Sequence, residues 1–200
     1  MLTQFPLLEE IAELLKNLPG VGKKSAQRYT LWLAENIGIT RKLADSLSKL
    51  SSTLDICPKC HGLMERGSEI CPICSDETRR RDTLCVVEGL ENFLAIESSG
   101  VYNGLYYILG KSTSPVNGIE RALSSLDSLL ERVKKEGVKE LILVVSSTVE
   151  GDLTAQYIKE KLKGSNTVVS RIAYGIPVGA DVSYLDKSTL VEAFKSRRTV

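Results

Sequence analysis

Apolar side chains recur at spacings of three and four along residues 7–54, which is the pattern of one face of an α-helix. The first stripe consists of Leu7, Leu8, Ile11, Leu14, Leu15 and Leu18. Pro19-Gly20 is expected to end that helix. A second helix is expected to begin near Ser25, with a face formed by Ala26, Tyr29, Thr30, Leu33 and Ile37. The third stripe is Leu43, Leu47, Leu50 and Leu54, so the pattern predicts three helices.

Short apolar runs alternate with helical patterns from residue 84 to residue 173. The expected strands are Leu84–Val87, Leu105–Leu109, Leu141–Val145 and Val168–Ala173. The expected helices are Leu90–Glu97, Ile119–Lys135 and Leu153–Leu162, followed by a helical tail at Leu190–Arg198. Leu141–Val145 is apolar at every position, as a central strand of a parallel sheet usually is. Strands that alternate with helices predict an α/β domain with a mainly parallel sheet.

Four cysteines lie between these two regions in two identical brackets. Cys57-Pro58-Lys59-Cys60 is followed, ten residues later, by Cys71-Pro72-Ile73-Cys74. A tetrahedral zinc ion takes four thiolate ligands at about 2.3 Å, and two C-x-x-C turns supply them from two short loops. We therefore expect Cys57, Cys60, Cys71 and Cys74 to hold one structural Zn²⁺ per chain.

The competing interpretations of the cysteines fit less well. A redox C-x-x-C motif normally occurs once, and four buried structural thiols would not explain the paired spacing. The fifth cysteine, Cys85, lies in an apolar run and is interpreted as a core residue. His61 could replace a cysteine as a ligand, but four thiolates already fill the coordination shell. We therefore expect His61 to be exposed.

Composition excludes several classes of protein. The chain has 200 residues, of which 42% are hydrophobic and 26% charged, as in an ordinary globular protein. Its first residues lack the basic start of a signal peptide, and no apolar run approaches the length of a membrane span. We therefore expect a cytoplasmic protein without membrane contact, in which clustered cysteines are metal ligands rather than disulfides.

The turn between the first two expected helices combines two glycines with a basic run. Gly20 and Gly22 can leave backbone N–H groups open at the N-terminus of the next helix, where anions are favoured. Lys23, Lys24 and Arg28 add positive charge beside them. Such a turn suits a DNA phosphate and carries no base code.

The surrounding charge supports this interpretation, because no acidic residue occurs between Glu13 and Glu35. A plain helix–helix corner remains the alternative, since a G-x-G pattern alone is weak. With its proline and its flanking helices, the turn resembles the helix-hairpin-helix motif of many DNA repair proteins. Arg79-Arg80-Arg81, which closes the cysteine region, is the next place where DNA contact is expected.

A second group of polar residues follows the expected strand at Leu84–Val87. Glu88-Gly89 comes at the carboxyl end of that strand, where α/β proteins form their sites, and Ser146-Ser147-Thr148 follows a later strand. The pairing resembles the Toprim domain of topoisomerases, primases and some nucleases. In catalytic members a strand-end glutamate and a D-x-D pair hold magnesium. Glu88 matches that glutamate, but Ser146 and Thr148 occupy the D-x-D positions and Asn92 replaces an aspartate.

The missing acids argue against phosphodiester chemistry, because a hard divalent cation would have few ligands. Glu150 and Asp152 remain nearby and have two interpretations. They could form, with Glu88, a degenerate Toprim site or a docking surface for a partner. They could equally be acids that complement the dipole of a helix N-terminus.

A helix-hairpin-helix, a four-cysteine knuckle and a Toprim domain without its D-x-D acids occur in this order in the RecR family of bacterial recombination mediators. The chain resembles that family over essentially its whole length. The stretches that carry the resemblance are Leu18–Arg28, Cys57–Cys74, Thr148–Ala155, Arg171–Gly179 and Leu190–Arg198. Two features depart from the family: Ser146-Ser147, where Asn-Pro is common, and Glu88-Gly89, which is closer to a catalytic Toprim domain.

The resemblance implies a function without catalysis. RecR-like proteins act with RecO and RecF to load the RecA recombinase on gapped or single-stranded DNA, and they assemble as dimers and ring-like tetramers able to surround DNA. It therefore implies DNA (single-stranded, gapped or duplex), RecO, RecF and further copies of the chain as partners. A net charge of only +1 independently predicts weak, salt-sensitive binding per chain, which several copies on one DNA would strengthen. A catalytically active Toprim enzyme and a zinc adaptor that binds only protein remain as alternatives.

The expected architecture is therefore an α+β chain of several parts. These are a helix-hairpin-helix region at 1–55, a four-cysteine zinc finger at 56–80, an α/β Toprim domain with a mainly parallel sheet at 81–175, and a C-terminal tail with a helix at 176–200.

Overall fold

The computed structural model describes residues 4–110, 118–173, 176 and 179–197. The chain divides into two compact units, Met1–Asp55 and Ile56–Val200. The first unit is helical, and the second contains the cysteines and a parallel sheet with its helices. The expected division of the second unit into zinc finger, Toprim domain and tail stays a prediction.

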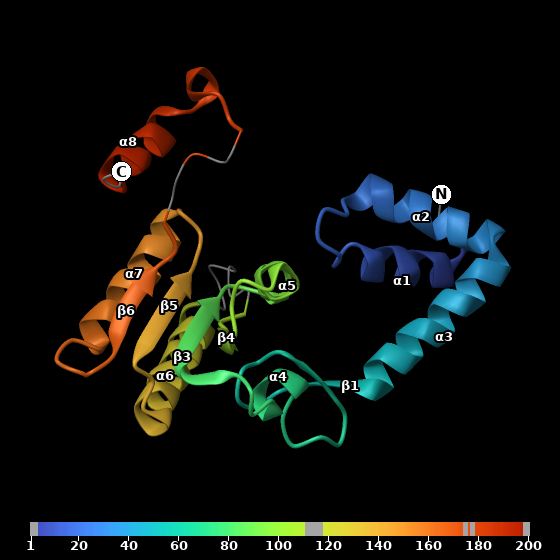
Figure 1. Cartoon of the computed structure of the whole chain (residues 1–200). Helices are drawn as coiled ribbons and strands as arrows, with labels where there is room; N and C mark the ends of the chain where they lie inside the picture. The colour runs from blue at the N-terminus through green and yellow to red at the C-terminus, as the bar shows by residue number, and fades with distance from the viewer. Residues whose placement is uncertain (1–3, 111–117, 174–175, 177–178, 198–200) are drawn as a thin grey trace. The chain divides into compact units, whose positions relative to one another are not determined.

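The helices of the first unit are α1 (Pro6–Leu15), α2 (Lys23–Glu35) and α3 (Ile37–Thr53). Helices α1 and α2 lie side by side as a hairpin (Figure 1). Ala12 and Ala26 are buried, and these small side chains allow the two helices to approach closely. Thr30 is also buried and donates a hydrogen bond from Oγ1 to the Ala26 carbonyl at 2.9 Å.

One expectation for this unit needs correction, and the third expected helix is confirmed. Helix α2 begins at Lys23 rather than near Ser25, because the extended backbone of Gly22 (φ −84°, ψ 172°) directly precedes the first helical turn. Helix α3 contains Leu43, Leu47 and Leu50 of the third apolar stripe, while Leu54 begins β1, and no residue of α3 is buried. Leu43, Leu47 and Leu50 are 44–58% exposed, so the stripe forms a helix without forming a core in this unit.

The second unit begins with a segment that surrounds the four cysteines, and we call residues 56–76 the knuckle. Strands β1 (Leu54–Ile56) and β2 (Leu63–Glu65) form a two-stranded sheet, and α4 (Pro72–Ser75) is a single turn. The sequence predicted none of these elements, because three or four residues are too few to establish a period.

A four-stranded parallel sheet forms the centre of the second unit (Figure 1). The strands, in spatial order, are β4 (Gly104–Ile108), β3 (Arg80–Val87), β5 (Glu140–Val144) and β6 (Val168–Arg171). Cys85 of β3 is in register with Tyr106 on one side and Ile142 on the other. β3 and β5 are therefore the inner strands, which confirms the central position expected from the apolar run at Leu141–Val145.

Helices cover both faces of this sheet. Helices α6 (Gly118–Glu136) and α7 (Val149–Lys161) pack on one face, and α5 (Leu90–Ser99) packs on the other. Leu84 belongs to the first of these cores, and Cys85 belongs to the second. Cys85 is 2% exposed and its burial raises the pKa of its thiol to about 12, which confirms it as a core residue. Ile73 of the knuckle packs into the same core as Cys85.

The C-terminal tail contains a short 3₁₀ turn at Val182–Tyr184 and α8 (Lys187–Lys195). Asp186 caps α8 by accepting a hydrogen bond from the Thr189 N–H at 2.9 Å. The expected tail motif includes Tyr174, Gly175, Pro177, Val178 and Arg198, which lie outside the described residues. Across the part of the chain that the structure describes, no helix is both long enough and apolar enough to cross a membrane.

Candidate metal centre and nucleic-acid interface

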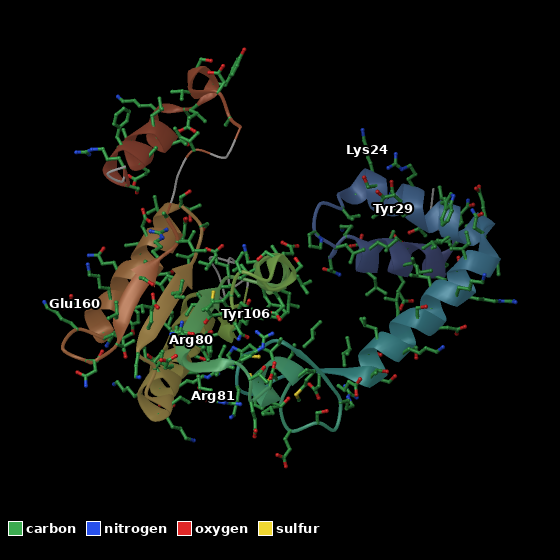
Figure 2. The ribbon with its side chains drawn as sticks, viewed as in Figure 1. Lys24, Tyr29, Arg80, Arg81, Tyr106 and Glu160 are labelled. Atoms are coloured by element: carbon green, nitrogen blue, oxygen red, sulfur yellow. The ribbon has the colours of Figure 1, made fainter. Side chains whose placement is uncertain are left out.

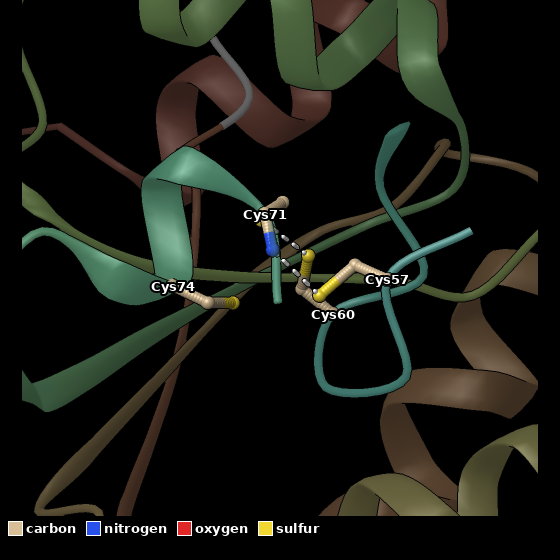
Figure 3. Close-up of side chains that lie close together, drawn as sticks. All are labelled: Cys57, Cys60, Cys71 and Cys74. Atoms are coloured by element: carbon tan, nitrogen blue, oxygen red, sulfur yellow. Dashed lines mark hydrogen bonds between the residues drawn. The ribbon is translucent and has the colours of Figure 1, made fainter. Parts of the chain in front are cut away.

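The four bracketed cysteines converge on one point (Figure 3). Cys57 follows β1, Cys60 lies one turn later, Cys71 is the N-cap of α4 and Cys74 lies within α4. All four side chains are buried, and their Sγ atoms lie within 4.8 Å of one another. Sulfurs bound to one tetrahedral zinc ion are about 3.8 Å apart, because each Zn–S bond is about 2.3 Å. The cluster therefore has the size of a four-thiolate metal site.

Hydrogen bonds to sulfur strengthen this assignment. The Gly62 N–H donates to Cys60 Sγ at 3.3 Å, and the Cys71 N–H donates to Cys57 Sγ at 3.4 Å. The sulfurs of Cys60 and Cys71 are 3.4 Å apart. Their hydrogen bond lowers the pKa of the Cys71 thiol and raises that of Cys60. Backbone donors aimed at sulfur suit thiolates that bind a metal better than neutral thiols.

The donor set fits zinc in a structural site. Four cysteine sulfurs complete a tetrahedral shell and leave no position for water or substrate. When bound, zinc would hold the two brackets together, and the site would supply no Lewis acid for catalysis. Each bracket contributes two sulfurs, so the metal would close the chain between Cys60 and Cys71 as a loop.

The first bracket also contacts the edge of the parallel sheet. The Ile108 N–H donates to the Cys60 carbonyl at 2.8 Å. His61 Nδ1 lies 3.2 Å from the Ile108 carbonyl oxygen, and its ring is 4.8 Å from the ring of Tyr107. His61 is therefore half-buried against β4, and the expectation that it is exposed was wrong. Its left-handed backbone (φ 60°) turns the chain so that the ring meets the sheet.

A buried arginine also holds the first bracket. Arg132 of α6 is only 8% exposed. Its Nη1 donates to the carbonyl of Lys59 at 2.8 Å and to that of Tyr106 at 2.9 Å, while its Nε pairs with Glu136 at 3.0 Å. Sequence reasoning missed Arg132, because a single arginine in an amphipathic helix gives no signal of its distant carbonyl partners.

Two arginines of the basic run at residues 79–81, Arg79 and Arg81, contact the end of the knuckle, whereas Arg80 is exposed and pairs with Asp82. Arg79 pairs with Glu97 of α5, and its Nη1 also donates to the Gly104 carbonyl at 3.2 Å. Arg80 and Arg81 lie at the start of β3 (Figure 2), because that strand begins at Arg80 rather than at Leu84. Arg81 donates to the Cys74 carbonyl at 3.5 Å. The side chain of Arg79 is 10% exposed, so it is not available as the DNA contact expected of this run.

The turn of the helical hairpin has an open surface. Gly20 has φ +77°, a left-handed conformation that favours glycine, and Gly22 is the N-cap of α2. A Cβ added to either glycine would meet no atom within 4 Å, so a ligand can approach the backbone there. Helix α2 has no acidic residue in its first turn, where its free N–H groups favour an anion.

Three cations lie along the first turns of α2. Lys23, Lys24 and Arg28 are exposed, and Figure 2 shows Lys24 extending from the N-terminal part of the helix. The Arg28 guanidinium lies 5.4 Å from the centre of the Tyr29 ring. The structure therefore brings together all five residues that the sequence proposed for phosphate binding. Whether they bind DNA stays a prediction.

The carboxyl edge of the sheet places Glu88 beside the two residues that replace the D-x-D pair. Glu88 Oε1 accepts hydrogen bonds from the Ser146 N–H at 2.8 Å and the Ser146 hydroxyl at 2.7 Å. The hydroxyls of Ser146 and Thr148 are 3.1 Å apart. Thr148 is also the N-cap of α7 and accepts from the Gly151 N–H at 3.2 Å. The site is thus a network of hydroxyls around one carboxylate.

The other two acids of this region have separate surroundings. Asp152 pairs with Arg171 at 2.6 Å, and Arg171 also donates to the Ser146 carbonyl at 2.8 Å. Glu150 lies in the first turn of α7, and the hydrogen bond from its own backbone N–H lowers the pKa of its carboxyl group. The helix-dipole interpretation therefore suits Glu150, while Asp152 belongs to an ion pair that ties α7 to β6.

Comparison with known proteins gives matches along most of the chain. A model of the Toprim domain matches residues 82–173, a model described as "RecR, helix-hairpin-helix" matches residues 8–51, and one described as "RecR, C-terminal" matches residues 175–198. The Recombination protein RecR of Magnetococcus marinus is 43% identical over 201 residues, which is 100% of both chains.

Two further relatives have the same name. The Recombination protein RecR of one strain of Thermus thermophilus is 42% identical over 193 residues, covering 96% of this chain and 97% of the relative. That of Porphyromonas gingivalis is 39% identical over 200 residues, covering 98% and 96%. The similarity is therefore continuous and not restricted to one motif.

Proposed function

This chain belongs to the RecR family of recombination proteins, and we propose that it is a DNA-binding mediator of recombinational repair without catalytic activity. It acts with RecO and RecF to help load RecA on gapped or single-stranded DNA. It works as an oligomer, a dimer or a ring-like tetramer that clamps DNA, in the bacterial cytoplasm. The four parts of the chain are the regions 1–55, 56–80, 81–175 and 176–200.

The observation that carries this proposal is the open, acid-free turn that precedes α2. Gly20 and Gly22 leave backbone N–H groups accessible at a helix N-terminus, and Lys24 and Arg28 stand beside them. Backbone donors, a helix dipole and two cations together suit one phosphate of a DNA strand. Phosphate contacts carry no sequence information, so we propose binding that is independent of sequence.

The knuckle and the Toprim domain have supporting roles in this proposal. One structural Zn²⁺ per chain, held by Cys57, Cys60, Cys71 and Cys74, closes the knuckle. The edge of the sheet carries one carboxylate, Glu88, and two hydroxyls in place of a magnesium-binding set. We propose that Glu88, Glu150 and Asp152 form a surface for a protein partner rather than a nuclease site.

Weak contacts per chain explain why assembly matters for this function. The net charge is only +1, so the whole chain has no broad electrostatic attraction to DNA. A few phosphate contacts in each copy give weak binding that falls steeply with salt. Several copies on one DNA strengthen the binding by avidity. A closed ring also prevents the protein from leaving the DNA sideways.

The test is a salt titration of DNA binding by three proteins. The parent is compared with Lys24→Ala plus Arg28→Ala, and with Arg41→Ala plus Lys42→Ala, which removes the same two types of charge from exposed positions on α3. We expect the first variant to bind every sequence more weakly and to have a flatter dependence of log K on log salt, by about one unit per lost contact. The α3 variant should retain the parent's slope.

Equal slopes for the parent and the Lys24/Arg28 variant would contradict the proposal, and the turn would then be a structural corner. A measurement of solution mass with and without DNA tests the second part of the proposal, that the protein works as an oligomeric clamp. A protein that remains a monomer on DNA at saturating concentration would contradict the clamp.

A further inference from the structure

Arg132 joins three segments that are far apart in the sequence. It lies on α6, and its Nη1 donates to the Lys59 carbonyl in the knuckle at 2.8 Å and to the Tyr106 carbonyl in β4 at 2.9 Å. Its Nε pairs with Glu136 one turn further along α6 at 3.0 Å. One guanidinium therefore holds a metal-binding loop against the edge strand of the sheet.

The contact falls on the part of the loop where it affects the ligands most. Lys59 lies between Cys57 and Cys60, so its carbonyl orientation is set by the same peptide units that direct the two sulfurs. The next carbonyl, that of Cys60, accepts from the Ile108 N–H at 2.8 Å. Two consecutive carbonyls of the first bracket are thus fixed from outside the knuckle, one by α6 and one by β4.

Charge gives a second reason for an arginine at this place. Four thiolates and one Zn²⁺ carry a formal charge of about −2, and a buried charge needs a compensating partner. Arg132 is 8% exposed, and its Nη2 has no hydrogen-bond partner among the described residues. A buried cation with one carboxylate partner, Glu136, can favour a nearby anionic metal centre.

The polar contacts that hold the second bracket are longer and more exposed. Arg81 donates to the Cys74 carbonyl at 3.5 Å and to the Asp76 carbonyl at 3.3 Å, and its side chain is exposed. Both distances are longer than those of Arg132, and an exposed guanidinium competes with water for its partners. The second bracket therefore meets the sheet mainly through the apolar packing of Ile73, whereas the first bracket is fixed to α6 and β4 by short hydrogen bonds.

We propose that Arg132 is a positioning residue of the metal centre, which couples metal binding by the four cysteines to the order of the β4 edge. Metal binding fixes the loop from Cys57 to Cys60, and the fixed loop presents its carbonyls to Arg132 and Ile108. The coupling works in both directions, because an ordered β4 edge also holds the loop in the shape that binds metal.

The inference rests on the proposed zinc site, so the metal content of the parent is measured first. The full chain is then compared with Arg132→Met, which keeps the length and removes the donors, and with Arg132→Lys, which keeps one charge. Lys134→Met, an exposed position on the same helix, is the matched control. Competition with a chromophoric chelator gives the zinc affinity of each protein.

We expect Arg132→Met to lower the zinc affinity about 10- to 100-fold, the range typical when a group that orients metal ligands from outside the coordination shell is lost. The zinc affinity of Arg132→Lys should lie between those of Arg132→Met and the parent. Lys134→Met should bind zinc as tightly as the parent does. The spectrum of the cobalt-substituted variant should still report four thiolates. An unchanged affinity in Arg132→Met would overturn the inference, and absence of metal from the parent would overturn both proposals.

A second measurement separates coupling from simple packing. Thermal unfolding of parent and Arg132→Met is followed with zinc and with chelator. Coupling predicts a larger drop in the unfolding temperature with zinc than without it, whereas a packing role predicts equal drops. If Arg132→Met does not fold, hydrogen exchange of the Ile108 amide in the parent still tests whether metal binding is coupled to the β4 edge. Removal of zinc should speed that exchange at least 10-fold, while the Leu143 amide of inner strand β5 changes little; equal exchange with and without zinc would overturn the inference.

Discussion

Glu88 accepts two hydrogen bonds from Ser146 through a single oxygen, one from the backbone N–H at 2.8 Å and one from the hydroxyl at 2.7 Å. In a catalytic Toprim domain an acid at the position of Ser146 would repel this glutamate, and a divalent cation would join them. In this protein the neutral Ser146 binds Glu88 directly by hydrogen bonds, and no cation is needed to join the two residues. The carboxylate is therefore satisfied within the fold.

The first prediction is that magnesium has no effect on the parent but stabilises a variant with the acids restored. Ser146→Asp plus Thr148→Asp places three carboxylates at one edge, so their repulsion should lower the unfolding temperature in the absence of cation. Mg²⁺ should raise the unfolding temperature again. At a Mg²⁺ concentration of 100 times its Kd, the gain in unfolding free energy should be about 2.7 kcal/mol. Thermal unfolding with and without MgCl₂ measures this, and an equal rise in the parent would contradict it.

The parent should also leave DNA intact in the presence of Mg²⁺ or Mn²⁺. Incubation with single-stranded, gapped and duplex DNA, followed by electrophoresis, checks the absence of cleavage. The decisive control is Glu88→Gln. Cleavage by the parent that disappears in this variant would show a working Toprim enzyme.

The second prediction concerns the metal. Metal analysis of the purified protein should find one zinc per chain, and chelation or Cys60→Ser should unfold the knuckle, because metal binding at such sites is worth roughly 10–16 kcal/mol. Cys85→Ala is the matched control, since Cys85 is a core cysteine outside the cluster. It should keep the full zinc content despite lost packing. A Cys60→Ser protein with normal zinc content would contradict the assignment.

The third prediction is a loss of stability in acid that depends on Glu97. The hydrogen bond from Arg79 holds the pKa of Glu97 below its usual 4.5 in the folded protein. The ion pair therefore stabilises the fold above about pH 4.5, and its contribution is lost as the pH falls through the lower, folded-state value. Glu97→Gln should cost about 1–3 kcal/mol at neutral pH, because Arg79 is 10% exposed and would lose its charged partner.

Denaturant unfolding between pH 3 and pH 7 tests this, with Glu77→Gln as the exposed control. Stability of the parent should fall more steeply below about pH 4.5 than that of Glu97→Gln. Parallel pH curves for the two proteins would show that the pair contributes nothing.

The fourth prediction separates two glycines of the first unit. Gly20 has φ +77°, so Gly20→Ala should destabilise the helical hairpin by about 1–2 kcal/mol. Gly38 lies in α3, where a Cβ meets no atom within 4 Å, so Gly38→Ala should cost nothing. Fluorescence of Trp32, the only tryptophan, can follow unfolding of this unit. Equal stability of both variants would mean that the turn relaxes without cost.

The elements with a clear period were predictable from the sequence, and those without one were not. The apolar stripe of α1 located its helix, although only Ala12 of that helix is buried, and the unbroken apolar run at Leu141–Val145 located the inner strand β5. β3 was predicted too short, because its first residues are polar: Arg80 pairs with Gly104 of β4 through the backbone, and the Arg81 side chain donates to the Cys74 carbonyl. Strand pairing depends on the backbone, which the hydrophobic pattern does not report.

The metal cluster was predictable because its chemistry lies in the local sequence. Two C-x-x-C brackets define four ligands without knowledge of the fold. His61 was not predictable, since its burial depends on Tyr107, which is distant in the sequence. The same holds for Arg132 and Lys59, whose contact spans 73 positions. Local spacing identifies the ligands of a site, but only the tertiary structure identifies what holds them.

The close approach of the knuckle to β4 also limits how the sequence can vary. A Cβ on Gly62 would lie 3.2 Å from Cys60 Sγ, which is a tight contact, and 3.6 Å from Ile108 Cδ1, which is an ordinary one. A side chain at position 62 would therefore displace a sulfur of the metal cluster, and a larger one would also press against β4. The turn after the first bracket thus has room for little more than glycine.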